Sequence, residues 1–176
     1  MQTPTSTNGV VSKDVLYQQI CEQLQELLGN EKNFVANAAN TAALLFQSLP
    51  GINWAGFYIA EENELVLGPF QGKPACVRIP FGKGVCGTAA AERKTIVVPD
   101  VSKFSGYIAC DPTTRSEIAV PLLNWGKLLG VLDIDSPDLN RFEDEDRDGI
   151  ESIASVFLAS QATNDLPDLS EEAATP

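Results

Sequence analysis

Three of the four cysteines lie between Gly68 and Asp111, where glycines and prolines force the chain into repeated turns. The turns are expected at Gly72, Lys73–Pro74, Gly82, Gly84 and Gly87. The thiols are Cys76, Cys86 and Cys110, separated by ten and by 24 residues. This arrangement favours thiol chemistry over simple packing, and the rest of the chain is then a scaffold that brings the thiols together.

The length and composition are those of one globular domain. The chain has 176 residues, 44% of them hydrophobic, which is enough for a core of its own. We expect the domain at 12–160, a flexible polar leader at 1–11 and a disordered acidic tail at 161–176. Since no segment approaches the roughly 18 consecutive apolar residues of a membrane span, we expect a cytoplasmic protein without membrane contact.

The charge and the missing histidine exclude several functions. With 24 acidic and 12 basic residues, the formal charge of −12 would repel phosphate backbones, so we expect no nucleic acid partner. Histidine is absent, so proton transfer must use carboxylates, thiols, tyrosine or lysine. The cysteines lack the close pairs of a structural zinc site, and we expect no metal.

Hydrophobic spacing and breakers predict two helices before any strand, and a final helix after the last strand. Taken in order, we expect helices at 12–28 and 31–49, strands at 53–60, 64–70 and 75–80, a short helix within 82–94, a strand at 95–99, a loop at 100–114, strands at 115–123 and 128–136, and a helix at 141–160. Ser12 is the expected cap of the first helix and Gly29 its end.

Three carboxylates in the last strand pair are candidates for a site. Asp133 and Asp135 project from one face of a strand, although aspartate disfavours strands. A three-residue loop or a bulge would place Glu117 opposite Asp133 on that same face. A two- or four-residue loop would turn Glu117 to the other side.

The local surroundings of the thiols give a first estimate of their reactivity. Cys86 falls in the first turn of the short helix, where the helix dipole and Lys83 favour the thiolate. The charge of Asp111 should raise the pKa of Cys110 beside it. Cys21 lies on the first helix, where a packing role is the simpler interpretation.

Two aromatic residues on the first strand have two interpretations. Trp54 and Tyr58 share one face of that strand. They are either core or cross-strand pairs, or one wall of a ligand site.

The segments LGPFQGKPAC, FGKGVCGTAA, IACD, SEI and GVLDIDS, in this order, resemble the free methionine-(R)-sulfoxide reductases, enzymes built on a single GAF domain. The resemblance extends from about Leu16 to Phe157. It implies an α/β fold of the α+β type, with a central antiparallel sheet of about six strands. The N- and C-terminal helices would pack on one face of that sheet and the active-site loops on the other.

The resemblance also implies the reaction, a thiol-dependent reduction of free L-methionine (R)-sulfoxide. Cys110 would attack the sulfoxide sulfur, and the resulting sulfenic acid would be captured by Cys76, with Cys86 as an alternative partner. A thioredoxin-like reductant would recycle the disulfide, without metal or organic cofactor. Local electrostatics favours Cys86 as the thiolate, but the family pattern favours Cys110, which we adopt.

Further roles follow from the same resemblance. Asp133 and Asp135 would hold the substrate ammonium group, and Glu117 would meet the sulfoxide oxygen. Crowded carboxylates raise the pKa of at least one member, which supplies a protonated acid without histidine. Trp54 and Tyr58 would then line the site around the methyl end of the substrate.

One departure and several alternatives stay open. The family usually has a histidine shortly before the cysteine of IACD, where this chain has Tyr107, so activity could be slower or shifted to higher pH. A GAF-type small-molecule sensor or a redox sensor without turnover is the alternative function. A homodimer and a role in oxidative stress are further expectations of the resemblance.

Overall fold

The structure is a computed structural model that describes residues 12–161, and the predicted order of elements is confirmed. The elements are α1 (Lys13–Leu28), α2 (Phe34–Ser48), β1 (Trp54–Glu61), β2 (Glu64–Gly72), β3 (Arg78–Pro80), α3 (Gly84–Glu92), β4 (Ile96–Val98), the 3₁₀ turn η1 (Val101–Lys103), β5 (Ser116–Asn124), β6 (Lys127–Ser136) and α4 (Asp144–Gln161). The expected leader at 1–11 and nearly all of the expected tail lie outside the described residues; Gln161 is the last residue of α4.

Local chemistry explains where the first two helices begin and end. The Ser12 hydroxyl accepts a hydrogen bond from the Val15 N–H at 3.4 Å, and Gly29, with a φ of 48°, ends α1. Asn33 caps α2 through the Ala36 N–H at 3.0 Å. Because of that cap, α2 begins at Phe34, three residues later than predicted.

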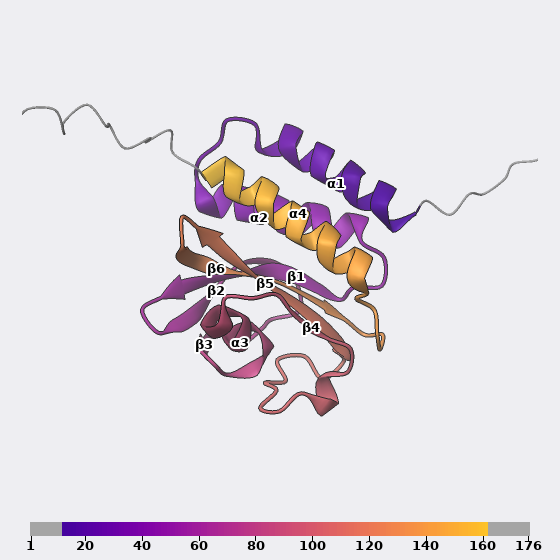
Figure 1. Cartoon of the computed structure of the whole chain (residues 1–176), viewed down its shortest axis with the longest axis vertical. Helices are drawn as coiled ribbons and strands as arrows, with labels where there is room; N and C mark the ends of the chain where they lie inside the picture. The colour runs from indigo at the N-terminus through magenta and orange to yellow at the C-terminus, as the bar shows by residue number, and fades with distance from the viewer. Residues whose placement is uncertain (1–11, 162–176) are drawn as a thin grey trace, which may run out of the picture.

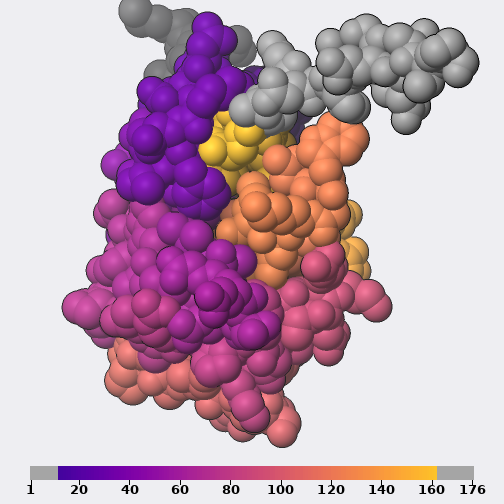
Figure 2. Space-filling view, turned by 90° about the vertical axis from the view of Figure 1, so that its left-hand side faces the viewer, coloured from indigo at the N-terminus to yellow at the C-terminus, as the bar shows by residue number. Residues whose placement is uncertain are grey.

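Six antiparallel strands form one sheet in the order β3-β2-β1-β6-β5-β4. Helices α1, α2 and α4 cover one face, and α3 with the glycine-rich segments covers the other (Figure 1). Figure 2 shows the orange β5–β6 hairpin beside the yellow helix α4 on the outer surface. The fold class predicted from the resemblance is confirmed.

Alternation along the strands divides the interior into two cores. The core under the three long helices includes Phe57, Ile118, Leu132, Ile134 and Phe157. The core under α3 includes Trp54, Tyr58, Val85, Cys86 and Val131. Residues of β1, β5 and β6 that point away from the long helices therefore meet the glycine-rich segments, where the thiols lie.

The short strand β3 differs from the prediction. A strand was expected at 75–80, but only Arg78–Pro80 is a strand. Residues 73–77 instead form a loop, and the Val77 carbonyl accepts a hydrogen bond from the Leu67 N–H at 2.9 Å. This loop places Cys76 against the edge of the second core.

The register of β5 and β6 depends on a bulge. The hairpin loop has two residues, Trp125 and Gly126, which by itself would have turned Glu117 away from the aspartates. The pairs are Asn124 with Lys127, Leu123 with Leu128 and Leu122 with Gly130. Leu129 is therefore an extra residue on β6, and the alternation is shifted by one from there on.

The bulge places all three carboxylates on one face, as the prediction with a bulge required. The exact pairing was wrong, however: Glu117 lies opposite Asp135, and Ala119 lies opposite Asp133. The loop and the bulge together shift the pairing by two residues relative to the expected one. A shift of two preserves the face, so the carboxylates still converge.

A buried ionic group joins α1 to α4. Asp146 is fully buried and accepts hydrogen bonds from the Tyr17 hydroxyl and Arg141 guanidinium at 2.8 Å each. The Lys13 ammonium and the Glu143 N–H donate to its other oxygen at 2.7 and 2.9 Å. Within residues 12–161, no helix is long and apolar enough to cross a membrane.

Candidate functional site

A small cavity lies between the second core face of the sheet and α3. It is lined by Trp54, Tyr58, Ala75, Ile79, Gly84, Val85, Cys86, Tyr107, Ile108, Cys110, Asp111, Glu117, Asp133 and Asp135. Its volume is about 30 Å³, which is room for about two water molecules. Seven of the eight residues proposed from the sequence line this cavity, and Cys76, the eighth, is bonded to Cys110 at its edge.

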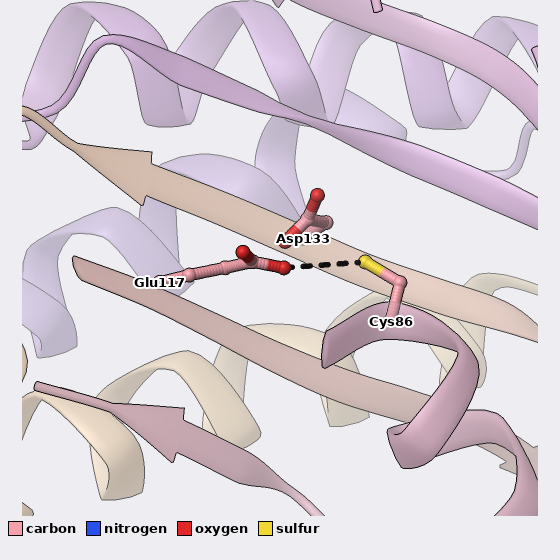
Figure 3. A group of neighbouring side chains, drawn as sticks. All are labelled: Cys86, Glu117 and Asp133. Atoms are coloured by element: carbon pink, nitrogen blue, oxygen red, sulfur yellow. Dashed lines mark hydrogen bonds between the residues drawn. The ribbon is translucent and has the colours of Figure 1, made fainter. Parts of the chain in front are cut away.

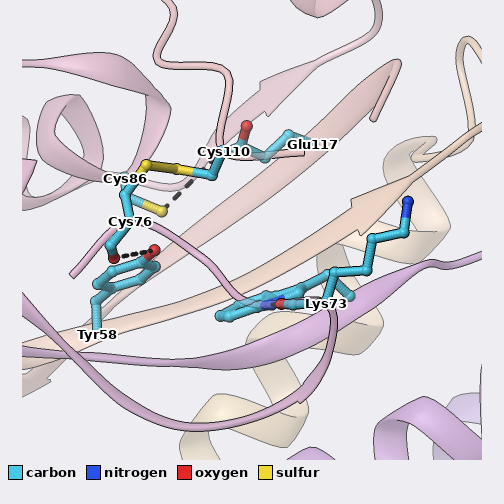
Figure 4. The surroundings of a disulfide bond; sticks show 7 residues. Tyr58, Lys73, Cys76, Cys86, Cys110 and Glu117 are labelled. Atoms are coloured by element: carbon cyan, nitrogen blue, oxygen red, sulfur yellow. Dashed lines mark hydrogen bonds between the residues drawn. A yellow bond between two sulfur atoms is a disulfide. The ribbon is translucent and has the colours of Figure 1, made fainter. Parts of the chain in front are cut away.

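Cys76 and Cys110 form a disulfide (Figure 4). Their Cα atoms are 5.5 Å apart, within the range of about 4.4–6.8 Å that a disulfide requires. Both cysteines are half-buried, whereas Cys86 is a buried free thiol close to them. The fold therefore brings together three thiols from three separate segments.

The three carboxylates lie deep in the cavity, and the two aspartates are incompletely satisfied. Glu117 and Asp133 are only 6% and 5% exposed. Within residues 12–161, no group donates a hydrogen bond to Oδ1 of Asp133 or Oδ1 of Asp135, although both atoms are buried. A buried acceptor without a donor is unfavourable, so these two oxygens indicate a missing positively charged or donating ligand.

Burial changes the protonation of these groups. It raises the pKa of Asp133 to about 7, although hydrogen bonds from Cys86 and Glu117 partly oppose this rise. Burial, then the nearby charge of Asp133, raises the pKa of Glu117 and of Asp135 well above their ordinary values. None of the described residues that line the cavity is basic, so protonated carboxyls persist at neutral pH.

Cys86 corrects one prediction. It lies in the first turn of α3, as expected, and its thiol donates to Oε1 of Glu117 across 3.7 Å (Figure 3). Burial, then the charges of Asp133 and Glu117, raise the pKa of this thiol. The expected thiolate was wrong because Lys83 is exposed to solvent, and desolvation outweighs the dipole of a short helix.

The two aromatic residues are core residues, and a role as one wall of a ligand site stays a prediction. Trp54 and Tyr58 are buried and line the cavity. The Tyr58 hydroxyl donates to the Cys76 carbonyl at 3.0 Å, and Nε1 of Trp54 donates to the Lys73 carbonyl at 3.1 Å. The aromatic wall therefore also holds the loop that carries Cys76.

The Cys110 segment is attached to the Cys76 loop by an ion pair that the sequence analysis missed. Asp111 accepts hydrogen bonds from the Thr113 N–H at 2.8 Å and from the Lys73 ammonium at 3.3 Å. The Thr113 N–H, followed by its hydroxyl and Lys73, holds the pKa of Asp111 below its ordinary value. Both partners flank cysteines in the sequence, but nothing in the sequence pairs them across 38 residues.

Tyr107 and Ile108 also line the cavity from the Cys110 segment. Gly84 has a φ of 59°, and a Cβ there would lie 3.3 Å from the Ile108 side chain. The glycine at the start of α3 thus lets the Cys110 segment approach the helix. Cys21, by contrast, lies on α1 beside the first core, away from the cavity, which fits its expected packing role.

A metal ion would find one group of ligands in the site. The thiol of Cys86 and carboxylate oxygens of Glu117 and Asp133 all lie within 4.8 Å of one another. Each of the three residues is buried. A cation in this cavity would therefore be surrounded by acidic groups.

Comparisons with known proteins agree with this architecture. A protein-family model described as GAF domain matches residues 13–158. The free methionine-R-sulfoxide reductase of Escherichia coli is 47% identical over 88% of this chain and 94% of its own length. Protein YtsP of Bacillus subtilis is 55% identical over 76% of this chain and 83% of its own. The structure of free methionine-R-sulfoxide reductase from Neisseria meningitidis in complex with its substrate is 42% identical, with a TM-score of 0.83 over 87% of this chain and 92% of that one.

Proposed function

The chain belongs to the GAF-domain family and, within it, to the free methionine-R-sulfoxide reductases, and we propose that it reduces free methionine (R)-sulfoxide at the cavity described above. The observation that carries the proposal is the meeting of three thiols with two buried carboxylate oxygens that lack a donor. Thiols supply the electrons for a sulfoxide, and the carboxylates supply a site for an amino group.

The substrate ammonium is assigned to Asp133 and Asp135. An ammonium group has three N–H donors and can satisfy both Oδ1 atoms at once. Its positive charge also offsets the repulsion between the buried carboxylates. Trp54 and Tyr58 provide the apolar wall for the methyl end of the side chain.

Cys110 is the proposed nucleophile. Its sulfur attacks the sulfoxide sulfur, an S–S bond forms, and the protonated sulfoxide oxygen leaves as water. Water then attacks the Cys110 sulfur, the S–S bond breaks, and methionine leaves with the electron pair of that bond. Cys110 becomes a sulfenic acid, so the substrate gains two electrons and the cysteine loses them. Glu117 is the proposed acid for the sulfoxide oxygen, because burial and the charge of Asp133 raise its pKa well above the ordinary value and favour the protonated carboxyl.

Cys76 is the proposed resolving thiol. Its sulfur attacks the sulfenic acid of Cys110, a disulfide forms, and the hydroxyl leaves as water. A thioredoxin-like dithiol would then reduce this disulfide by exchange, which the partial exposure of both cysteines supports. Cys86 is the alternative partner, although its raised pKa makes it a slow nucleophile near neutral pH.

The disulfide implies a movement during the cycle. With the disulfide formed, Cys110 is bonded to Cys76 at the edge of the cavity, so its sulfur cannot attack a sulfoxide. Reduction frees the Cys110 segment from the Cys76 loop, leaving the weaker Lys73–Asp111 pair between them. We infer that substrate enters the reduced form and that disulfide formation displaces the product.

Turnover of separated epimers tests the function. The protein, a dithiol reductant and each epimer of free or peptide-bound methionine sulfoxide are incubated, and methionine formation is measured. The free R epimer should be reduced, and Cys110→Ser should abolish its turnover. Cys76→Ser should still reduce one equivalent of methionine sulfoxide per enzyme in a single turnover, because only the resolving thiol is lost. Disulfide formation with an oxidant, without turnover of any sulfoxide, would instead establish a redox sensor.

A further inference from the structure

The cavity gathers acidic groups without a compensating cation. Cys86, Glu117 and Asp133 place one thiol and two carboxylates around one point, all buried. Oδ1 of Asp133, on a residue 5% exposed, has no donor among residues 12–161. No described residue that lines the cavity is basic, and Lys73 is paired with Asp111.

The distances suit a tetrahedral cation. Zn²⁺ binds thiolate sulfur at about 2.3 Å and carboxylate oxygen at about 2.0–2.2 Å, so a tetrahedral site separates sulfur from oxygen by about 3.6 Å. Sγ of Cys86 and Oε1 of Glu117 are 3.7 Å apart. A carboxylate oxygen of Asp133 lies within 4.8 Å of both atoms, so it is the third candidate ligand of the same site.

We propose that Cys86, Glu117 and Asp133 form an inhibitory binding site for a divalent cation of borderline softness, such as Zn²⁺. One thiolate and two carboxylates form a mixed sulfur–oxygen set, which Zn²⁺ accepts and which Mg²⁺ and Ca²⁺ disfavour. A water molecule is the natural fourth ligand, and the cavity has room for an ion and a water.

The ion can bind in either redox state, whereas the reaction needs the reduced form. In the disulfide form Cys110 is bonded to Cys76 and cannot attack a substrate, but Cys86 remains a free thiol. Binding of the ion displaces the thiol proton to solvent, so about one proton is released from Cys86 for each ion bound. In the disulfide form, Cys76 and Cys110 cannot act as metal ligands, so any thiolate ligand in the cavity must come from Cys86.

The inhibitory effect rests on the proposed function, but the binding does not. Asp133 is the residue assigned to the substrate ammonium, so an ion on it excludes the substrate. Inhibition should accordingly raise the substrate concentration needed for half-maximal rate. Zn²⁺ affinity, by contrast, can be measured on the oxidised protein without any substrate.

The first test measures Zn²⁺ binding to the oxidised full chain by competition with a chromophoric chelator. The wild type should bind one equivalent, and Cys86→Ala should weaken the affinity by more than about a hundredfold, since it removes a ligand. Cys21→Ser is the matched control, because it removes the other free thiol and should leave the affinity unchanged. No binding by the wild type, or equal affinity in Cys86→Ala, would overturn the proposal.

Co²⁺ provides a second readout, because a charge-transfer band reports a thiolate ligand directly. The oxidised wild type should show a sulfur-to-cobalt charge-transfer band, which Cys86→Ala should lose. Glu117→Gln should keep this band but bind Co²⁺ more weakly, because it retains the thiolate and loses one anionic oxygen. A band that survives in Cys86→Ala would place the metal elsewhere and refute the assignment.

The inhibitory part is tested by single turnovers of the reduced, desalted enzyme. Zn²⁺ should increase the methionine sulfoxide concentration at half-maximal rate and leave the maximal rate unchanged. A lower maximal rate with unchanged half-saturation would refute competition at Asp133. If the enzyme reduces no sulfoxide at all, the proposed function fails, whereas Zn²⁺ binding to the oxidised protein remains a separate result.

Discussion

Two buried aspartates in this protein face opposite electrostatic surroundings. Asp146, between α1 and α4, accepts four hydrogen bonds, from Tyr17, Arg141, Lys13 and the Glu143 N–H. Burial alone would raise the pKa of Asp146, but these donors outweigh it and lower the pKa. Asp133 is equally buried, yet its Oδ1 has no donor among residues 12–161 and its pKa is raised.

The difference separates a structural carboxylate from a functional one. A buried charge that is fully paired holds two elements together and leaves nothing for a ligand. A buried carboxylate in which one oxygen lacks a donor is unfavourable without a cation, so it retains affinity for a cation. Replacing the aspartate should therefore reduce stability in the helical layer and reduce activity in the cavity.

The largest expected effect is on stability, at Asp146. Asp146→Ala leaves Lys13 and Arg141 without their buried partner and should lower the free energy of unfolding by about 3–5 kcal/mol. Denaturant titration measures it, with Asp144→Ala as the control, because Asp144 is exposed and its pair with Arg147 contributes little. A loss at Asp146 no larger than at Asp144 would break the comparison.

The matching change in the cavity should affect activity instead. Asp133→Asn removes the charge that faces the substrate ammonium and should lower kcat/KM about thirty- to a thousandfold. This corresponds to a loss of about 2–4 kcal/mol in transition-state stabilisation. Its free energy of unfolding should not fall, because an unfavourable buried charge is removed. Steady-state kinetics and denaturant titration on one preparation check both. Full activity with reduced stability would contradict the distinction.

Two glycines extend the comparison to packing. A Cβ at Gly149 would lie 2.1 Å from the Tyr17 ring, and one at Gly56 would lie 2.6 Å from the Trp54 ring. Each change to alanine should cost about 1–3 kcal/mol of stability through overpacking. Only Gly56→Ala should also raise KM, because Trp54 lines the cavity. Thermal unfolding measures the loss of stability and steady-state kinetics measures KM. A raised KM in Gly149→Ala would contradict the expectation that only the glycine beside the cavity affects substrate binding.

The last comparison is the pH dependence of stability, measured with a chelator present. Asp146 has a lowered folded pKa, so its contribution is present above the unfolded pKa of about 3.9 and is lost as the pH falls. Asp133 has a folded pKa of about 7, so the wild type loses stability as the pH rises from about 4 to 7.

Asp133→Asn should remove the part of that decline that Asp133 contributes, while Glu117 and Asp135 retain theirs. The variant should therefore gain stability relative to the wild type at pH 8 and not at pH 4. Denaturant midpoints at the two pH values measure this difference. An equal effect of the substitution at both values would show that Asp133 does not titrate between them.

The order of elements could be predicted because it depends on local patterns. The spacing of apolar residues in α1 and α4, the cap at Ser12 and the stop at Gly29 are readable in the sequence. The pairing of Lys73 with Asp111 could not be predicted, because it joins two loops that come together only when the sheet has formed. The environment of Cys86 was misjudged because its neighbours, Glu117 and Asp133, come from strands more than 30 residues away.

The sequence by itself determined which residues could do chemistry: three thiols, three carboxylates and no histidine. It also determined the helices and strands, since their periods follow from side-chain hydrophobicity. Only the tertiary structure decided that Glu117 shares a face with the aspartates, through one extra residue at Leu129. Only burial decided which acids keep their protons, because desolvation depends on everything packed around a carboxyl and not on its neighbours in the chain.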